Sequence, residues 1–416
     1  MSPIHPTVQV VGRRHEVSHH ELRDLLTRTA QPHEWYEAGS PAARELLAWL
    51  ALDDPPLPVV VDGDEVITGA TVTGLADAWH TRGARSRSHY ELAIIGAGPA
   101  GLAAAVYAAS EGLSTLLIER DVPGGQASYT SMIENFFGFP GGIGGAELAR
   151  LAGRQAEQFG AELLILSGVE SGEMSAAGDV RLALAGGSDK RDGGDRGARH
   201  AMAPPRRPRS RGAARARRLL RRRPQRGGAV HERRGGAENS AGQAVLHLAN
   251  AGARVTMVVR GSGLGRNMAA YLLERIERHP LIDVRFETQV VAVHPEGGHL
   301  GAVTLAGADG RTEVKRAAGL FLCIGGTPRS GWADAVGVRT DAAGYILTGS
   351  DLLRAGRRPE NWPLDRDPLP LETSLPGFFA AGDVRHGSAK RVAGAVGEGA
   401  MAVALVHRRL EELDAG

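Results

Sequence analysis

Alternating apolar runs and amphipathic stretches along the chain predict an α/β protein. In the first 80 residues, the apolar runs Val8–Val11 and Leu57–Val61 predict strands, and the spacing of leucines over Glu21–Thr29 predicts a helix. The other elements expected here are a strand at Glu34–Glu37, a helix over Pro41–Leu50, a hairpin strand over Glu65–Thr68 and a helix over Leu75–His80. The predicted order of this part is therefore β-α-β-α-β-β-α.

A second pattern begins at Tyr90 and contains the clearest chemical signal of the chain. The apolar pair Ile94-Ile95 runs into Gly96-Ala97-Gly98-Pro99-Ala100-Gly101, a helix over Leu102–Ser110 follows, and a strand at Leu116–Ile118 ends in Glu119. In a Gly-x-Gly-x-x-Gly turn, the first glycine makes the turn, the second lets a pyrophosphate approach and the third lets helix and strand pack. The helix N-terminus offers N–H groups to phosphates, and the acid can accept from a ribose hydroxyl. The sequence therefore predicts a dinucleotide site.

The C-terminal half returns to an α/β pattern from Asn239 onward. A helix through Asn250 is followed by a strand at Arg254–Val259 and a helix over Tyr271–Arg278. Strands are then expected at Val284–Phe286, Val290–His294 and Val303–Leu305, with a further strand after Gly319 and a helix of small residues over Ala395–Ala404. This half predicts a second nucleotide-binding type of unit followed by a C-terminal helix.

Residues 186–236 interrupt the pattern with arginine, glycine, proline and alanine and almost no β-branched or aromatic residues. Such a composition buries little apolar surface, so we expect no globular structure there. Residues 191–234 hold 16 arginines against three acids, a net charge of +13, whereas the whole chain carries +2. The rest of the chain is therefore acidic, at −11, and the high isoelectric point describes one segment only.

Chain length and cysteine content limit the number of domains and the cellular locations that are expected. A chain of 416 residues suggests two or three domains, and its lack of an 18-residue apolar run predicts no membrane span. Its N-terminus lacks the charged and apolar regions of a secretory signal, and Cys323 is the only cysteine. A cytoplasmic location is the expectation that fits these features.

Further motifs give the chain a resemblance to a known family. These are Gly124-Gly125-Gln126, Ile133-Glu134-Asn135-Phe136, Gly382-Asp383 and Lys390-Arg391-Val392-Ala393. With the glycine-rich turn, they resemble the bacterial thioredoxin reductases, flavin- and pyridine-nucleotide-dependent disulfide oxidoreductases. The resemblance covers about residues 90–184 and 239–410. It implies two Rossmann-like α/β domains, an FAD domain split in sequence and an NAD(P)H domain inserted in it.

The resemblance implies a set of FAD-binding residues. Gly96, Gly98 and Gly101, with Pro99 and Ala100 between them, match the pyrophosphate turn, Glu119 matches the ribose ligand and Arg120 follows it. Gly125 and Gln126 match the loop beside the ribityl chain, Asn135 matches an asparagine that supports the flavin, and Asp383, after Gly382, matches the ligand of the ribityl hydroxyls. Arg391, Val392 and Ala393 match the segment against the pyrimidine end of the flavin, where the positive end of the next helix stabilises reduced flavin.

The second nucleotide site matches the family less well. Asn239, Ser240 and Ala241 match the start of the NADPH helix, and Arg260 matches the arginine that meets the 2′-phosphate. Glu238, however, stands at the second glycine of the family turn, and His231-Glu232-Arg233-Arg234 stands where an apolar strand belongs. Gly261 replaces the companion arginine, so NADPH is only mildly favoured over NADH as electron donor.

The N-terminal part resembles a thioredoxin or glutaredoxin module, with Pro58 at the position of that fold's cis-proline. The Cys-x-x-Cys of that fold is missing near Arg14–His20, and the family's own pair is also missing from the nucleotide-binding part. A disulfide reductase needs one thiolate to attack and a second thiol to resolve. Cys323 lies in an apolar strand and is expected to be a buried, inert thiol. We therefore expect a module for docking or support and no dithiol mechanism.

Three interpretations of residues 186–236 stay open: a reading-frame error, a basic tether and a nucleic-acid-binding segment. Codons for Arg217–Arg226, shifted by one base, can encode Gly-Val-Tyr-Tyr-Gly-Ala-Ala-Arg-Ser-Glu, which resembles the family sequence at this place. The same shift over Ala198–Pro204 can yield a stretch that begins Ala-Thr, as the family's strand end does. The lack of aromatic residues disfavours nucleic acid as a partner.

The expected organisation and function follow from these matches. The domains are a thioredoxin-like module over 1–83, a linker over 84–89, FAD domain over 90–185, the aberrant segment over 186–236, an NAD(P)H domain with a damaged first strand over 237–315, and the rest of the FAD domain over 316–416. The function implied is hydride transfer from NAD(P)H to FAD without a redox dithiol. The alternative is a non-catalytic FAD-binding docking or sensor protein. No catalytic side chain and no metal are expected, the electron acceptor is not identified beyond a redox protein as one candidate, and a homodimer is expected.

Overall fold

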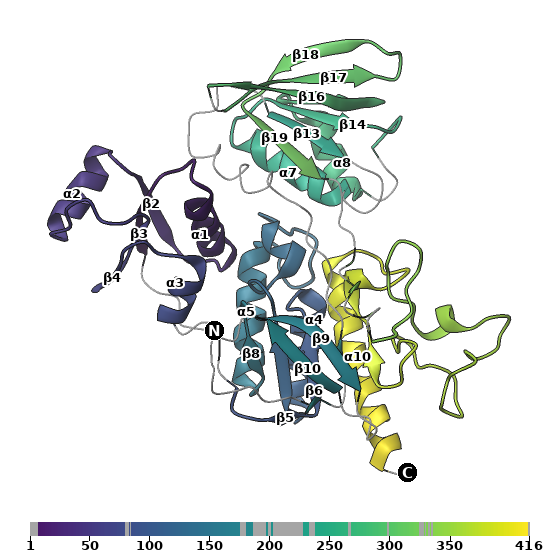
Figure 1. Cartoon of the computed structure of the whole chain (residues 1–416). Coiled ribbons are helices and arrows are strands. Elements are labelled where there is room, and N and C mark those ends of the chain that lie inside the picture. Colours follow the sequence, from purple (N-terminus) through teal and green to yellow (C-terminus); the bar gives the residue numbers. More distant parts are fainter. Residues whose placement is uncertain are drawn as a thin grey trace. The chain divides into compact units, whose positions relative to one another are not determined.

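The fold is taken from a computed structural model of the chain (Figure 1). It describes residues 7–79, 83, 85–174, 180–185, 197–198, 201–202, 228–232, 238–264, 268–297, 299–323, 328, 330–331, 333 and 336–414. Internal contacts divide the chain into two compact units. The first combines Met1–Ser128, Asn135–Arg206 and Pro328–Gly416, and the second combines Tyr129–Glu134 with Arg207–Thr327.

The N-terminal module, residues 7–79, is a four-stranded sheet with three helices. Its elements are β1 (Val8–Gly12), α1 (Val17–Arg28), β2 (His33–Glu37), α2 (Pro41–Trp49), β3 (Val59–Asp62), β4 (Glu65–Ile67) and α3 (Val72–Ala78), in the order that the sequence predicts. The strand order is β2-β1-β3-β4, with β1 parallel to β2 and antiparallel to β3. The Leu57–Pro58 peptide is cis, as the thioredoxin resemblance implies. That resemblance itself stays a prediction.

A five-stranded parallel sheet forms the centre of the first unit. Its strands are β6 (Leu92–Ile95), β7 (Thr115–Ile118), β8 (Glu162–Leu164), β12 (Ala201–Met202) and β20 (Phe378–Phe379), in the order β20-β12-β6-β7-β8. Helices α4 (Pro99–Ser110), α5 (Gly145–Gln158) and α10 (Val392–Asp414) pack with it around a core rich in alanine and leucine. The small side chains of α4 are almost all buried, so this helix fits closely between its neighbours.

A second, smaller sheet in this unit has the order β5-β11-β10-β9. It consists of β5 (His89–Tyr90), β9 (Gly168–Met174), β10 (Val180–Ala185) and β11 (Gly197–Ala198). The expected linker before β5 is anchored to β8 of the five-stranded sheet, because Ser86 donates its backbone N–H and its hydroxyl to the Glu162 carboxylate, and the Tyr90 hydroxyl donates to the same carboxylate at 2.6 Å. Burial and these carboxylate contacts raise the pKa of Tyr90 to about 12.

The second unit contains a parallel sheet and an antiparallel sheet. The parallel sheet, β15-β14-β13-β19, comprises β13 (Gly228–Glu232), β14 (Val255–Val259), β15 (Ile282–Arg285) and β19 (Gly319–Cys323), with α7 (Glu238–Asn250) and α8 (Ala270–Arg278) beside it. The antiparallel sheet comprises β16 (Thr288–Glu296), β17 (His299–Gly307) and β18 (Thr312–Arg316). Because β19 pairs with β13, the second unit extends to Thr327, and the expected boundary at 315/316 is wrong.

The expectation of no regular structure over 186–236 is corrected in part. β12 pairs with both β6 and β20, and β13 pairs with both β14 and β19, so each occupies an interior position of its sheet. Parallel pairing uses backbone groups, which glycine and alanine supply as well as larger residues. Residues 203–227 and 233–237 lie outside the described part, and so do the codons of the proposed frame shift at Arg217–Arg226.

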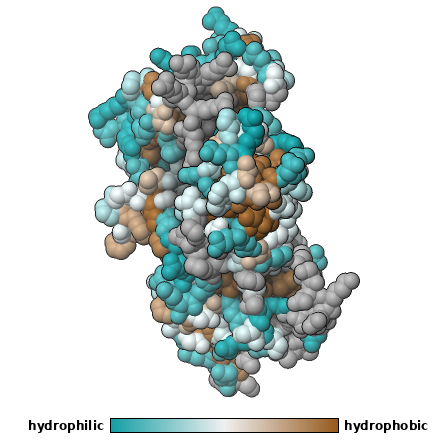
Figure 2. Space-filling model, turned by 90° about the vertical axis from the view of Figure 1, so that its left-hand side faces the viewer, coloured by the Kyte–Doolittle hydropathy of each residue, from teal (hydrophilic) through white to brown (hydrophobic). Residues whose placement is uncertain are grey.

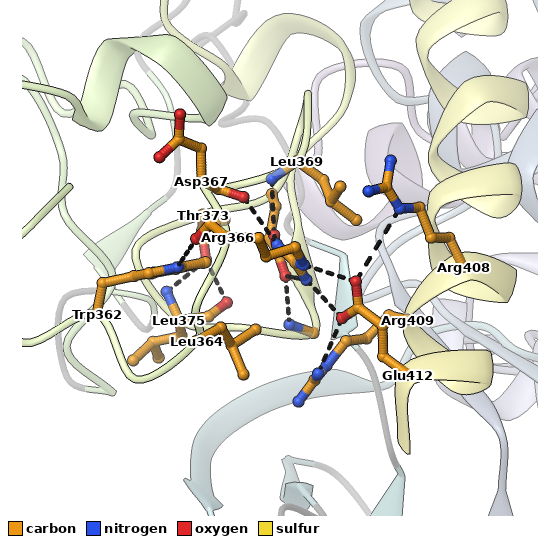
Figure 3. Close-up of polar contacts among 12 residues, drawn as sticks. Trp362, Leu364, Arg366, Asp367, Leu369, Thr373, Leu375, Arg408, Arg409 and Glu412 are labelled. Atoms are coloured by element: carbon orange, nitrogen blue, oxygen red, sulfur yellow. Dashed lines mark hydrogen bonds and ion pairs between the residues drawn. The ribbon is translucent and has the colours of Figure 1, made fainter. Parts of the chain in front are cut away.

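The segment before β20 is fastened to α10 by a buried ion network (Figure 3). Glu372 is 0% exposed and accepts from Arg366 at 2.7 Å and from the N–H groups of Leu369 and Gly377. Arg366 also pairs with Glu412 near the end of α10, at 2.6 Å. Burial alone would lower the pKa of Arg366, but its hydrogen bonds with Glu412 and Glu372 raise it. The network keeps all its charges paired and so fixes this loop to the helix.

The described surface carries exposed apolar side chains in several elements. On the face shown in Figure 2, apolar residues form small patches among polar ones. Trp49 and Phe137 are the most exposed of the large apolar residues. Within the described part of the chain, no helix is long and apolar enough to cross a membrane.

Candidate functional site

The glycine-rich turn after β6 has the geometry that a dinucleotide requires. Gly96 has φ +99° and donates its N–H to the Ile118 carbonyl at 2.7 Å. A Cβ on Gly98 would meet no atom within 4 Å, so the turn leaves open space there, whereas a Cβ on Gly101 would overlap the Gly96 carbonyl. Gly98 is the N-cap of α4, and Pro99 occupies the first turn. The first glycine therefore has a left-handed backbone, the second leaves space beside the start of the helix, and the third permits a close backbone contact; their roles at a dinucleotide stay predictions.

Glu119, directly after β7, holds this turn from the side. Its carboxylate accepts the N–H of Ala97 at 2.8 Å and the N–H of Asp121 at 2.9 Å. One bond joins the acid to the backbone of the turn and the other to the loop after β7, so the position of the carboxylate is fixed. Arg120 is exposed and lies against Gly168.

The Gly124-Gly125 loop returns to the same turn. Gly124 has φ +105° and donates its N–H to the Ala97 carbonyl at 2.7 Å. A Cβ on Gly125 would lie 3.3 Å from the Gly98 Cα, so the two loops are in close contact. Gln126 lies in the 3₁₀ helix η1 (Gly125–Tyr129) that follows. Asn135 is exposed.

The second predicted FAD motif approaches from the C-terminal part. Gly382 begins the 3₁₀ helix η3 (Gly382–Val384), has φ +77°, and donates its N–H to Glu398 of α10 at 2.6 Å. A Cβ on Gly382 would be 3.0 Å from the Ala100 Cβ. Glu398 also pairs with Arg385 at 2.7 Å. The structure therefore brings Gly382 and Asp383 to the start of α4, beside the glycine-rich turn.

Asp383 and Lys390 form the charged part of this site. Burial raises the pKa of the Asp383 carboxyl, which the charge of Lys390 only partly offsets. Burial likewise lowers the pKa of Lys390, whose ammonium donates to the Asp383 carbonyl at 2.5 Å and lies 4.0 Å from the centre of the Tyr345 ring. Within the described residues, no hydrogen bond reaches the Asp383 carboxylate. This half-buried carboxylate can therefore accept from the hydroxyl groups of a ligand.

The helix that follows begins earlier than predicted. α10 starts at Val392, so Val392 and Ala393 form its first turn, and the Ala395 N–H donates to the Arg391 carbonyl at 2.9 Å. Sequence reasoning expected the helix from Ala395 to Ala404 only. Lys390 has φ +50°, which turns the chain into the helix. A Cβ on Gly399 would overlap the Ala100 carbonyl, so α10 and α4 approach as closely as backbones allow.

These contacts provide a test of whether the chain fits FAD. Two helix N-termini, three glycine turns and two carboxylates lie within one unit, and the open space beside Gly98 is where a pyrophosphate would approach. The raised pKa of Asp383 suits a carboxyl that receives hydrogen bonds only when a polyhydroxyl ligand is bound. The residues present therefore fit the cofactor.

The predicted NAD(P)H residues lie in the second unit. Asn239 and Ser240 are in the first turn of α7, Ala241 is fully buried, and the Asn239 side chain accepts the N–H of Ala269 at 2.8 Å. Arg260 is exposed directly after β14. Glu238 begins α7, and the residues of the expected turn before it lie outside the described part. The strand thought to be damaged is present as β13, although its last residues are polar.

Comparisons with known proteins match both parts of the chain in which these residues lie. The pyridine nucleotide-disulphide oxidoreductase model matches residues 235–399, and the FAD dependent oxidoreductase model matches residues 91–162. The thioredoxin reductase of Bacillus subtilis is 30% identical over 343 residues, which cover 78% of this chain and 96% of that protein. This chain belongs to the thioredoxin reductase family. The expected cofactors, FAD and NADPH, are those of the family.

Further thioredoxin reductases are also similar to this chain. The NADPH-dependent thioredoxin reductase 3 of Arabidopsis thaliana is 31% identical and is covered over 58% of its length. The solved thioredoxin reductases of T. acidophilum and Lactococcus lactis match with TM-scores of 0.62 and 0.63, at 22% and 24% identity. They cover 77% and 78% of this chain and 99% of their own, and they confirm the α/β fold of the family.

The structure adds residues to this family site that the sequence analysis did not select. Glu398 accepts from the Gly382 N–H, and Lys390 contacts Asp383; both stand in the motif-rich C-terminal segment, but their roles depend on backbone geometry. Cys323 ends β19 and is half-buried beside the core of the second unit, so it is less buried than expected.

Proposed function

We propose that this chain is an FAD-dependent oxidoreductase that takes a hydride from NAD(P)H and delivers the electrons to an acceptor without a dithiol of its own. The observation that carries the proposal is the convergence of Gly98, Gly125 and Gly382 at the start of α4, together with the single cysteine of the chain. FAD, when bound, would supply the hydride-accepting and electron-donating chemistry. Two cysteines are needed for a resolving dithiol, so the acceptor must be reduced in another way.

Each side chain has a binding role in this proposal. The N–H groups at the start of α4 would bind the pyrophosphate, and Glu119 would accept from an adenosine ribose hydroxyl. Asp383 would accept from the ribityl hydroxyls, and the start of α10, including Arg391 to Ala393, would place a positive helix end at the flavin. Asn239, Ser240, Ala241 and Arg260 would contact NAD(P)H. None of these groups is needed as an acid or a base.

Rapid mixing under anaerobic conditions tests the proposal. Purified protein reconstituted with FAD is mixed with NADPH, and in a parallel experiment with NADH, while the visible flavin absorbance is followed. We expect bleaching of the flavin band with saturable dependence on the nucleotide. A protein that binds FAD but keeps its flavin oxidised at millimolar NADPH and NADH would contradict the enzyme proposal.

A second candidate function is a non-catalytic FAD-binding docking or sensor protein. Glu238 favours it, because a carboxylate at the start of α7 is unfavourable beside a pyrophosphate. The Glu238→Gly variant separates the two candidates. If it alone gains bleaching by NADPH, the chain as it stands has a disabled second site. A redox protein as acceptor and a homodimer belong to the first proposal, and mixing reduced protein with candidate acceptors tests the acceptor.

A further inference from the structure

A buried arginine of the N-terminal module reaches the loops of the FAD site. Arg28 is the last residue of α1, and only 4% of its surface is exposed. Its guanidinium pairs with Asp121 at 2.5 Å, lies 3.6 Å from Asp24, and donates from Nε to the Ser128 hydroxyl at 3.2 Å. Since a guanidinium stays charged even when buried, these partners determine where it can lie.

Asp121 provides the first connection from Arg28 to the cofactor turn. The Asp121 N–H donates to one oxygen of Glu119 at 2.9 Å, and the other oxygen of Glu119 accepts the Ala97 N–H at 2.8 Å. Glu119 is the carboxylate that we assign to the ribose. The ion pair of Arg28 therefore acts on the loop that orients this carboxylate.

Ser128 provides the second connection. It is 0% exposed, and its hydroxyl accepts from Arg28 and donates to the Gly125 carbonyl at 2.8 Å. Gly125 lies against Gly98 in the pyrophosphate turn. The two connections approach the cofactor turn from the ribose side and from the ribityl side.

An apolar contact fixes the same loop to the module. Val122, which follows Asp121, is 1% exposed and is part of the hydrophobic core that α1, β1 and β3 of the N-terminal module form. The loop between Glu119 and Gly125 thus holds the Val122 side chain and the Asp121 carboxylate against the module, while the Asp121 N–H contacts Glu119 beside the cofactor turn. Removing Arg28 would leave Asp121 and the Ser128 hydroxyl without this buried donor.

We infer that Arg28 is a positioning residue of the FAD site, through which the N-terminal module sets the affinity for FAD. This inference rests on the proposed FAD-binding function but assigns the module a role that does not require thiol chemistry. Arg28 touches no cofactor atom in this proposal; it holds Asp121 and Ser128, which hold the loops that do.

The test compares FAD affinity with protein stability in the full-length chain. Apoprotein variants Arg28→Ala, Arg28→Lys and Ser128→Ala are titrated with FAD by flavin fluorescence, and each apoprotein is melted separately. The matched control is Arg44→Ala, which removes an exposed arginine of α2 in the same module. We expect Arg28→Ala to raise the FAD dissociation constant about tenfold, as residues coupled to a ligand without touching it do.

The other variants distinguish positioning from a merely structural role. Ser128→Ala should also weaken FAD binding while leaving the melting temperature of the apoprotein nearly unchanged, since the ion pair of Arg28 remains. Arg28→Lys keeps the positive charge but loses the planar guanidinium that can donate to two partners. Its affinity for FAD should therefore lie between those of the wild type and Arg28→Ala. Arg44→Ala should bind FAD as the wild type does.

Two results would overturn the inference. One is an FAD dissociation constant within twofold of wild type in both Arg28→Ala and Ser128→Ala, even if the apoprotein of the former melts lower. The other is an equal loss of affinity in Arg44→Ala. A wild-type protein that takes up no FAD would instead overturn the proposed function, and the inference would fall with it.

Discussion

Asp383 is a half-buried carboxyl whose pKa is raised by burial and only partly restored by the charge of Lys390. The Gly382-Asp383 pair is visible as a motif, but the reason that its carboxyl is suited to a polyhydroxyl ligand is its burial beside Lys390 and the absence of a hydrogen bond to it within the described residues. Glu119 is similar, since the sequence places it after a strand but not its bonds to Ala97 and Asp121. Arg28 carried no signal, because its link to the cofactor loops depends on Asp121 and on Ser128, which is 100 residues away in the sequence.

The raised pKa of Asp383 predicts opposite effects of one substitution on stability and on binding. Since the folded pKa lies above the unfolded value, the favourable contribution of this group is present at low pH and is lost as pH rises through the folded pKa. Above the folded pKa, the ionised carboxylate therefore opposes folding of the apoprotein. Asp383→Asn should raise the melting temperature of the apoprotein by about 1–3 °C and weaken FAD binding about tenfold or more.

Melting curves at pH 5 and pH 8 and an FAD titration check this prediction. The stabilisation by Asp383→Asn should be smaller at the lower pH, where protonation already relieves the wild type. A variant that melts lower than wild type at pH 8, yet binds FAD normally, would contradict it.

Substitution of Glu372 is expected to lower the stability of the fold with little effect on the chemistry of the protein. Its carboxylate accepts from Arg366, Leu369 and Gly377, so an amide would turn a donor toward other donors. Glu372→Gln should lower the free energy of unfolding by about 3–5 kcal/mol, as breaking a buried ion pair does. Urea unfolding measures this loss of free energy, and the control is Glu360→Gln, which changes an exposed residue. Equal unfolding midpoints for both variants would refute the prediction.

Most elements could be predicted at their approximate positions, but not their ends. The helix after Lys390 begins at Val392 and not Ala395, and α1 begins at Val17 and not Glu21. Both helix starts depend on the backbone conformation of the residues that precede the helix, which the spacing of apolar residues does not encode. The strands β12 and β13 were not predicted, because their sequences lack the β-branched runs of interior strands and their pairing depends on neighbours far away in the chain.

The approach of α10 to α4 predicts different effects of two similar substitutions. Gly399→Ala would place a Cβ on the Ala100 carbonyl and push the helices apart, whereas Gly397→Ala, half a turn away, would meet nothing within 4 Å. Gly399→Ala should lower the melting temperature and the FAD content. Gly397→Ala should stabilise the protein by about 0.5–1 kcal/mol, because alanine favours a helix more than glycine does. Thermal melts and the ratio of flavin to protein test the pair, and equal behaviour of both variants would argue against the close approach.

At the scale of the whole molecule, the unusual feature is the distribution of charge over the fold. The segment with 16 arginines lies between the first part of the FAD domain and the second unit, and it also supplies the interior strands β12 and β13. Interior strands of parallel sheets are normally continuous apolar runs, because both faces of the sheet are covered. His231 and Glu232 at the end of β13 depart from this rule. Two polar residues therefore stand in β13, where the resemblance to the family implies an apolar strand.

A reading-frame error over this segment accounts for that conflict and predicts a gain of function. A fresh reading of the gene across codons 186–236 should find one missing or extra base, and the corrected frame should encode apolar strands. The frame-corrected protein should bleach its flavin faster, and at lower NADPH concentrations, than the chain with the printed sequence. FAD binding should differ less, because Gly98, Gly125 and Asp383 lie outside the affected codons. If the gene reading confirms the printed sequence and this chain is reduced rapidly by NADPH, the arginine-rich segment is a genuine part of a working enzyme.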